Sequence, residues 1–349
     1  MDSHTTDSIN LETFQESFKN KEEFREYLHD QLVKHHLPLI TTTTNKITRG
    51  DVLGEGSFGQ VIKGTVDGND VAIKLLTAVV YEKEADKTIR LILNEVLSMT
   101  RISDPGLPKF YGVFHDEENK EIGFVLEFLA GVTLHEFVLG KPVFEKHIIE
   151  REGCEPKEEL VEVDKEPQIS DKEICELLIE LCKICVSLHS KKIVHRDLKP
   201  KNVMVIPVEL DGKKTNKLVL IDFGIARINE GDCGFTSNQK YTPIYCPPEG
   251  RKDEGDENKT VYKITPKFDV WSFGCMMIQL FTGHKPWSKF QDVNKVYQAI
   301  KKIPNDVYKK VDSKCKALPL IKKCCKSNID DRLDSTELLE ELIKLRDSL

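Results

Sequence analysis

Three glycines recur at short spacing in the segment Gly54-Glu55-Gly56-Ser57-Phe58-Gly59. Glycine is required where the backbone approaches a phosphate group closely or adopts dihedral angles that other residues avoid. A dinucleotide-binding fold would continue from such a loop into a helix, whereas the strand-like run 61–66 follows here. The motif alone therefore leaves two interpretations open, a phosphate-binding loop and an ordinary hairpin turn.

A single lysine lies in the apolar run that follows. Val71-Ala72-Ile73-Lys74 places Lys74 on an apolar strand, and a buried ammonium group needs anionic partners. Two partners are available in principle: the phosphates of a nucleotide bound under the glycine segment, and the carboxylate of Glu95 on the helix expected over 82–102. A lone lysine or glutamate would otherwise be a solvated surface group.

Two more motifs, at 193–202 and 221–224, make the pattern specific. The first reads Ile193-Val194-His195-Arg196-Asp197-Leu198-Lys199-Pro200-Lys201-Asn202, and the second reads Ile221-Asp222-Phe223-Gly224. With the glycine segment and the lysine strand before them, the chain resembles the protein kinases over about residues 47 to 345. The resemblance implies an α+β, bilobal protein-kinase-like fold, with an antiparallel sheet and one long helix in the N-lobe and a mainly helical C-lobe.

The resemblance also implies catalytic roles. Asp197 would accept or orient the proton of the substrate hydroxyl, and Lys199 would neutralise charge at the γ-phosphoryl group of ATP. Asn202 and Asp222 would hold Mg²⁺, which favours oxygen ligands. Lys74 would grip the ATP phosphates, with Glu95 fixing its position. The residues expected around the nucleotide are Gly54, Glu55, Gly56, Ser57, Phe58, Gly59, Val61, Ala72, Lys74, Leu126, Glu127 and Leu129.

The expected activity is that of a serine/threonine protein kinase, which transfers the γ-phosphate of Mg·ATP to protein hydroxyls in intracellular signalling. Lys199-Pro200 and Thr242-Pro243 resemble serine/threonine kinases more than tyrosine kinases, and Thr242 would hydrogen-bond near Asp197. The alternative is an ATP-binding, pseudokinase-like scaffold with little turnover. A small-molecule kinase of the same fold is disfavoured by the long activation segment that ends at Pro247-Pro248-Glu249.

The resemblance carries hypotheses about regulation and specificity as well. Arg196 would meet a phosphate on the activation segment, and Thr236 or Ser237 is the expected acceptor for an upstream kinase. Kinases directed by arginine commonly carry acids at three positions, and none of the three is acidic in this chain. We therefore expect no strong preference for arginine before the target residue. The three positions correspond to Thr133, Lys201 and Gln279.

Two acidic residues of the second half are expected to be structural. Glu249 should form a buried ion pair with Arg332. Asp269, at the start of a helix, should anchor the backbone of the catalytic loop.

Hydrophobic periodicity organises the rest of the chain. Residues 1–45 are expected to be an amphipathic helical extension, residues 46–127 the N-lobe and residues 128–349 the C-lobe. Residues 145–166 hold nine acids against four bases, which indicates a solvated acidic insertion, with docking to a basic partner as the minority alternative. Expected strands cover 47–77 (three strands), 110–114 and 122–127, and expected helices cover 169–190, 270–282, 292–303, 314–325 and 335–348.

Composition limits the class of protein. The 349 residues are 39% hydrophobic and 31% charged, which is typical of a globular protein with a large core. The net charge of −7 argues against broad binding to nucleic acid or acidic membranes, since both need a basic surface. No leader, lipid-attachment signal or membrane anchor is visible, and the ten cysteines lack zinc-ligand spacing, so a cytoplasmic location is expected.

Overall fold

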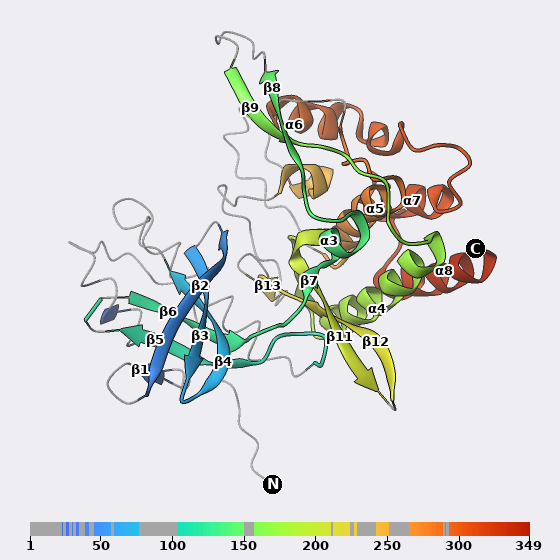
Figure 1. The fold of residues 1–349 in the computed structure, drawn as a ribbon. Helices are drawn as coiled ribbons and strands as arrows, with labels where there is room; N and C mark the ends of the chain where they lie inside the picture. The colour runs from blue at the N-terminus through green and yellow to red at the C-terminus, as the bar shows by residue number, and fades with distance from the viewer. Residues whose placement is uncertain are drawn as a thin grey trace. The chain divides into compact units, whose positions relative to one another are not determined.

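The structure is a computed structural model, shown in Figure 1. It describes residues 23, 26–27, 30, 33–34, 39–41, 45–56, 59–76, 104–116, 118–119, 121–149, 157–210, 212–223, 227–228, 242–250, 265–288, 290 and 293–349. The chain divides into two compact units. The sheet unit comprises the described residues of 1–97 and 109–128, and the helical unit comprises those of 98–108 and 129–349. This division agrees with the predicted bilobal α+β class.

The sheet unit is built on six strands in the order β1-β5-β6-β4-β3-β2. Five of them pair antiparallel, as the alternating sequence predicts. The sixth, β1, was not expected: it lies in the extension 1–45, where no strand was predicted, and pairs parallel with β5 at the sheet edge. The strands are β1 (Leu39–Thr41), β2 (Ile47–Gly56), β3 (Gly59–Val66), β4 (Asn69–Leu76), β5 (Phe110–Asp116) and β6 (Glu121–Glu127).

The turn between β3 and β4 is held by a local polar contact. Asp67 and Gly68 both have positive φ, 51° and 85°, which suits a tight hairpin turn. The Asp67 carboxylate accepts hydrogen bonds from the side chain of Asn45 and from the backbone N–H of Lys46. These bonds lower the pKa of Asp67 and fasten the segment that leads into β2 to the turn.

One face of the sheet carries the apolar core of this unit. Alternate residues of neighbouring strands share a face, so the register places a set of buried apolar side chains opposite to Lys74. Ile40 of β1 belongs to this cluster, which explains why the short strand is retained at the edge. The cluster comprises Ile40, Ile62, Val71, Ile73, Leu75, Phe114 and Val125.

The helical unit confirms the predicted series of helices to within four residues at each end, and α8 has the predicted bounds. Its central helix α5 is buried from Phe268 to Phe281, so it carries no solvent-facing stripe. The six-residue α3 was not predicted because it is too short to display a helical period. The helices are α3 (Leu134–Leu139), α4 (Asp171–Ser190), α5 (Lys267–Thr282), α6 (Val293–Lys302), α7 (Leu318–Cys324) and α8 (Ser335–Ser348).

Capping residues fix where the two long surface helices begin. Ser170 caps α4 and exchanges hydrogen bonds with Glu173, and Asp334 does the same for α8 with Glu337. Each pair is a capping box, which satisfies backbone N–H groups that a helix start leaves unbonded. The Cys182 and Cys185 thiols are buried in the core face of α4, and Cys324 and Cys325 are buried at the end of α7.

Short strands complete the helical unit. A three-stranded sheet has the order β12-β11-β7, and the long β11–β12 hairpin holds most of the residues between the two catalytic motifs. Three-residue helical turns include η1 (Pro200–Asn202), η2 (Pro243–Tyr245) and η3 (Pro248–Gly250). The strands are β7 (Val132–Thr133), β10 (Ile193–Val194), β11 (Val203–Leu210), β12 (Lys213–Leu220) and β13 (Arg227–Ile228).

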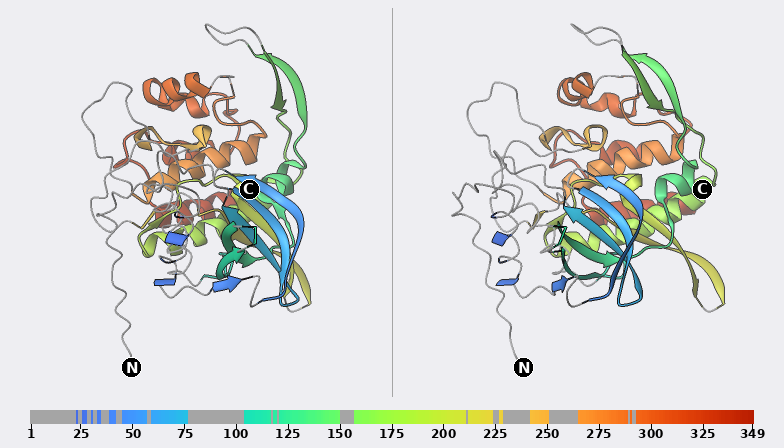
Figure 2. Two further views of the ribbon diagram at one scale, coloured as in Figure 1. Left: turned by 90° about the vertical axis from the view of Figure 1, so that its left-hand side faces the viewer. Right: turned by 60° about the vertical axis from the view of Figure 1, so that its left-hand side comes forward.

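The acidic insertion expected at 145–166 contains a two-stranded ribbon that the sequence did not predict. Residues of β8 (Phe144–Ile149) and β9 (Lys157–Glu162) form a two-stranded antiparallel ribbon that projects from the helical unit (Figure 2). Its base is not solvated, because Glu162 is only 9% exposed. The described side chains of this acidic segment are thus mostly exposed, whereas the Glu162 side chain at its base is buried.

Several sequence predictions lie outside the described residues. They are the long helix over 82–102 with Glu95, Ser57 and Phe58 of the glycine segment, and Thr236 and Ser237. The described residues between 23 and 34 are helical. Among the helices that the structure describes, none has the length and apolar character that crossing a membrane requires.

Candidate active site

The carboxylate of Asp197 lies in a compact polar cluster of the helical unit. Lys199 Nζ is 2.6 Å from Asp197 Oδ2, and Thr242 Oγ1 donates to Asp197 Oδ1 at 2.7 Å. Lys199 Nζ also donates to Thr242 Oγ1 at 2.9 Å, so the three side chains close a ring. The predicted contact of Thr242 with this site is confirmed. An ionised carboxylate held at the edge of solvent between an ammonium and a hydroxyl can receive a proton from an incoming hydroxyl group.

Asn202 joins the same cluster from η1. Its Nδ2 donates to the carbonyl oxygen and to Oδ2 of Asp197, both at 2.9 Å. With the amide nitrogen used in this way, the amide oxygen remains as a ligand atom. Asp222 follows the end of β12 with a positive φ of 66°, which is unusual for a residue other than glycine and is typical of functional sites.

A buried aspartate anchors the backbone of the catalytic loop. Asp269 accepts the backbone N–H groups of His195 and Arg196, each at 2.8 Å, and its Oδ2 lies 2.9 Å from His189 Nε2. Burial opposes ionisation of Asp269, but the His189 hydrogen bond, the nearby histidines and the Arg196 N–H outweigh it and lower the pKa of this carboxyl. The predicted structural role of Asp269 is confirmed.

His195 links the two catalytic motifs. Its Nδ1 accepts the backbone N–H of Asp197 at 3.3 Å, and its Nε2 lies 3.1 Å from the carbonyl oxygen of Ile221. This pattern fits the neutral tautomer with the proton on Nε2. The His195 ring packs edge-on against Phe223, with centroids 4.9 Å apart. These contacts of His195 hold the catalytic loop and the Asp-Phe-Gly motif in one arrangement.

The predicted ion pair between Glu249 and Arg332 is confirmed. Arg332 Nη1 and Nη2 donate to the two carboxylate oxygens of Glu249 at 2.6 and 3.0 Å. The remaining guanidinium donors reach the carbonyl oxygens of Lys267 and Lys326. All five donors of the buried arginine are thus used.

The residues expected around the nucleotide belong mostly to the sheet unit. The register pairs Val61 with Lys74 and Ala72 with Leu126, so these four side chains lie on one face of the sheet. Lys74 is only 7% exposed, in agreement with a buried ammonium group. Gly54, Glu55 and Gly56 end β2 and Gly59 begins β3, which makes the glycine segment the turn of a hairpin, as a strand after the loop requires.

The end of β6 is pinned by its own side chain. The Glu127 carboxylate accepts the backbone N–H of Lys109 at 3.1 Å, and the Glu127 N–H donates to the Lys109 carbonyl at 2.9 Å. Leu129 is the first described residue of the helical unit after this strand. Glu127 and Leu129, both expected around the nucleotide, therefore lie where the chain leaves the sheet.

Comparison with known proteins identifies the family. A model of the protein kinase domain matches residues 47–342. The chain belongs to the protein kinase domain family. It is 28% identical over 264 residues to the serine/threonine-protein kinase TIO of Arabidopsis thaliana, which covers 75% of this chain and 16% of that protein.

Other relatives of the kinase domain differ in their stated specificity. Identity is 26% over 291 residues with calcium-dependent protein kinase 5 of Plasmodium berghei, covering 81% of this chain and 42% of that protein. Identity is 26% over 257 residues with the tyrosine-protein kinase csk-1 of Caenorhabditis elegans, and the match covers 73% of this chain and 39% of that protein. The chain spans less than half the length of each of these three relatives.

One charged residue of the kinase domain was missed by sequence reasoning. Glu162, at the base of the ribbon, lies 3.0 Å from His135 Nε2, 2.9 Å from Lys201 Nζ and 3.2 Å from Lys285 Nζ. The His135 hydrogen bond and the two lysines lower the pKa of Glu162 against the opposing effect of burial. Lys201 belongs to η1, so Glu162 ties the ribbon to the catalytic loop. The partners come from three distant segments, and no local pattern indicated them.

Proposed function

We propose that this kinase domain transfers the γ-phosphoryl group of Mg·ATP to serine and threonine hydroxyls of proteins. The ring of Asp197, Lys199 and Thr242 carries the proposal, because it joins a proton acceptor to a cation beside a short hydroxyl group. Phosphoryl transfer asks little covalent chemistry of the protein and depends on positioning and on charge neutralisation. Intracellular signalling in the cytoplasm, with protein substrates, is the setting we propose.

The residues present fit Mg²⁺ and ATP. Mg²⁺ takes oxygen ligands, and the Asn202 amide oxygen and the Asp222 carboxylate supply them. Asn202 is oriented by its two bonds to Asp197, so the ligand set is held in advance. When bound, the ion would neutralise phosphate charge. Lys74, buried on its strand, and Lys199 are the cations assigned to the phosphates, with Glu95 as the partner of Lys74.

Each residue of the ring has a separate task in this proposal. Asp197 orients the acceptor hydroxyl and takes its proton, while Lys199 offsets negative charge on the transferred group. Thr242 holds both side chains and narrows the space in front of the carboxylate. That restriction favours a short Ser or Thr side chain over tyrosine, although one of the relatives named above is a tyrosine kinase.

The experiment is a phosphorylation assay with Mg·ATP and a generic protein substrate, read by mass spectrometry. Wild type should phosphorylate Ser and Thr, whereas Asp197→Asn and Asp222→Asn should lose at least about 10²-fold in turnover. Asp330→Asn, an exposed change distant in sequence from these motifs, is the matched control and should keep wild-type turnover.

The result separates the two candidate functions. The competing function is that of an ATP-binding scaffold, and binding of ATP without any Asp197-dependent turnover would establish it. Phosphotyrosine as the main product would refute the assignment to Ser and Thr. The proposed absence of an arginine preference is tested by the same assay with peptide arrays.

The proposal extends to regulation of the kinase domain. Thr236 or Ser237 would accept an activating phosphate from an upstream kinase, and Arg196 would pair with it. Protein that carries Thr236→Ala and Ser237→Ala should then be less active than phosphorylated wild type. Equal activity of the two would exclude this switch.

A further inference from the structure

Two lysine side chains share one carboxylate oxygen at the edge of the catalytic loop. Lys201 Nζ lies 2.9 Å and Lys285 Nζ 3.2 Å from Oε2 of Glu162, so the two ammonium groups are close neighbours. The other oxygen of this carboxylate, Oε1, lies 3.0 Å from His135 Nε2. One negative charge therefore faces two positive charges even before His135 is counted, and the charge left over is positive.

The second acid of this region, Asp164, is bonded elsewhere. Its Oδ2 lies 3.0 Å from His284 Nδ1, and its Oδ1 accepts the backbone N–H of Lys285 at 3.3 Å. Lys165, the next residue, adds a further cation, and its Nζ donates to a backbone carbonyl oxygen. Glu162, Asp164, Lys165 and Lys285 line one small cavity, so Asp164 does not remove the positive excess at the two lysines.

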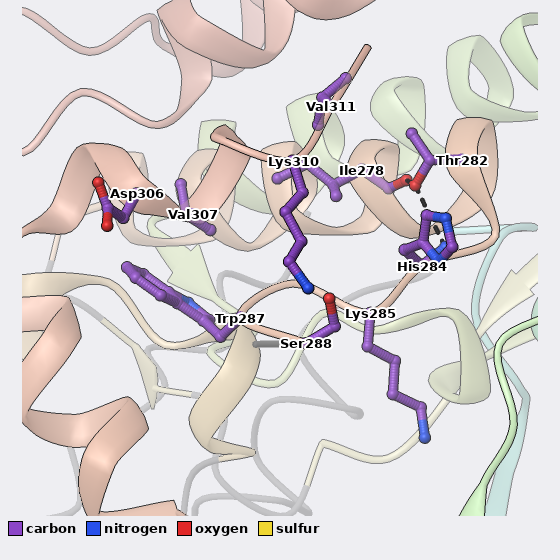
Figure 3. Close-up of a pocket in the computed structure, with 10 residues that line it drawn as sticks. All are labelled: Ile278, Thr282, His284, Lys285, Trp287, Ser288, Asp306, Val307, Lys310 and Val311. Carbon is purple, nitrogen blue, oxygen red and sulfur yellow. Dashed lines mark hydrogen bonds between the residues drawn. The ribbon is translucent and has the colours of Figure 1, made fainter. Parts of the chain in front are cut away.

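The two lysines reach solvent, whereas the carboxylate that holds them together does not. The side chain of Lys201 is 48% exposed and that of Lys285 is 29% exposed. Figure 3 shows the Lys285 side chain extending away from the other side chains drawn there. An ammonium group has three donors, and the bond to Glu162 uses one on each lysine. Donors thus remain for an anion that approaches from solvent, and the pair is organised before the anion arrives.

The catalytic loop places this pair within reach of a bound substrate. Lys201 precedes Asn202, whose Nδ2 donates to Asp197 Oδ2 at 2.9 Å. Successive Cα atoms are about 3.8 Å apart, so the Cα of Lys201 lies within about 10 Å of the Asp197 carboxylate. An extended peptide advances about 3.3–3.6 Å per residue, so side chains about two to four residues from the acceptor hydroxyl come level with the lysines.

We propose that Lys201 and Lys285 form a subsite for an anionic side chain of the protein substrate, about two to four residues from the phosphorylated Ser or Thr. The inference rests on the proposed function, because an acceptor hydroxyl at Asp197 determines where the peptide lies. The group recognised is a carboxylate or a phosphate, as in Asp, Glu or phosphoserine. Arginine is disfavoured there, because the Glu162 carboxylate is buried and already surrounded by cations.

Steady-state kinetics with matched peptides test the subsite. Each peptide carries one Ser acceptor in an alanine- and glycine-based sequence, with Glu, phosphoserine, Ala or Arg placed in turn up to about four residues away on either side. With wild type, kcat/KM for Glu at the best position should exceed that for Ala by about fivefold or more, and Arg should fall below Ala. Phosphoserine above Glu would assign the subsite to phosphate, and Glu above phosphoserine would assign it to a carboxylate.

Variants of the two lysines connect the preference to this site. Lys201→Met and Lys285→Met should each bring the ratio of kcat/KM between the Glu and Ala peptides close to one, and a ratio taken within each protein cancels changes in overall activity. Lys201→Glu should invert the order and favour Arg over Glu. Lys213→Met, at an exposed lysine of β12, is the matched control and should keep the wild-type ratio. An unchanged ratio in both Met variants of the subsite overturns the proposal.

Peptide binding tests the subsite without turnover. Fluorescein-labelled peptides in which Ala replaces the acceptor Ser are titrated with the full chain and followed by fluorescence anisotropy. The Glu peptide should bind about fivefold more tightly than the Arg peptide, and the difference should shrink in high salt. Equal binding of the two peptides overturns the subsite even if no peptide is phosphorylated. Ser phosphorylation that is equally fast with every peptide overturns the subsite and leaves the proposed function standing.

Discussion

Replacing Arg332 should destabilise the helical unit far more than replacing its partner Glu249. The guanidinium is completely buried and the Glu249 carboxylate is 20% exposed. Arg332 donates five hydrogen bonds, two to the Glu249 carboxylate and three to backbone carbonyl oxygens. Removing one partner of a buried ion pair costs about 3–5 kcal/mol, because the other partner and its neighbours are left unsatisfied.

The two substitutions break this arrangement to different extents. Arg332→Met removes every donor at once, strands the carbonyls of Lys267 and Lys326, and should cost about 3–5 kcal/mol in the free energy of unfolding. Glu249→Gln keeps an acceptor and a neutral hydrogen bond, and the exposed part of the side chain stays hydrated, so about 1–2 kcal/mol is expected. In the double variant the two losses should not add, because the residues share one network.

Urea denaturation, monitored by tryptophan fluorescence, measures these changes in the free energy of unfolding for the helical unit. The chain has two tryptophans, Trp271 and Trp287, and both lie in the helical unit. The Arg332 guanidinium carbon lies 5.2 Å from the Trp271 ring centroid, so replacing Arg332 changes the surroundings of this fluorophore. Circular dichroism should therefore be recorded as well, because it does not depend on the fluorescence of Trp271. A cost below about 1 kcal/mol for Arg332→Met, or equal costs for both single variants, would refute the reasoning.

Three further predictions concern the base of the ribbon, a glycine and a thiol. Glu162→Gln should lower the free energy of unfolding by about 2 kcal/mol at pH 7. The pKa of Glu162 is lowered in the folded state, so this stabilisation exists above the ordinary glutamate pKa and is lost as pH falls below about 4. The free energies of unfolding of wild type and Glu162→Gln, measured as a function of pH, should therefore converge in acid. A difference that persists in acid would contradict the ion-pair explanation. Gly283→Ala should cost at least about 2 kcal/mol, since φ is +72° and a Cβ would lie 2.0 Å from the Lys165 carbonyl oxygen. Gly212→Ala, with the same φ of +73° and open space, should cost only about 1 kcal/mol, and equal thermal shifts would refute the steric argument. Burial raises the pKa of Cys182 to about 12, so iodoacetamide at pH 8 should leave it unmodified by mass spectrometry until the protein unfolds. Rapid labelling of the native protein would show that this thiol is accessible.

The catalytic cluster could be predicted because its residues lie close together in the sequence. Asp197, Lys199 and Asn202 occupy one loop, and their mutual contacts follow once the motif is identified. The strands of the sheet unit were predictable for a different reason, since alternation and a single turn signal at Asp67-Gly68 determine them.

What the sequence did not indicate depends on partners far along the chain. Glu162 is buried because Lys201 and Lys285, 39 and 123 residues later, supply its counter-charges. Counting acids in a window cannot detect such pairing, so the sequence predicted an acidic insertion without indicating the buried base of the ribbon. Likewise, β1 is only three residues long and forms a strand because it pairs with the edge of β5. The β-propensity of its own residues does not indicate this pairing.

The parallel strand β1 also affects where a fragment containing only the kinase domain should begin. It precedes residue 47, where the match to the kinase domain begins, and it occupies one side of β5. A fragment cut at that boundary would uncover a row of backbone hydrogen-bonding groups and remove Ile40 from the apolar cluster. Aggregation of such a fragment would then reflect the chosen start site and not an intrinsically unstable kinase fold.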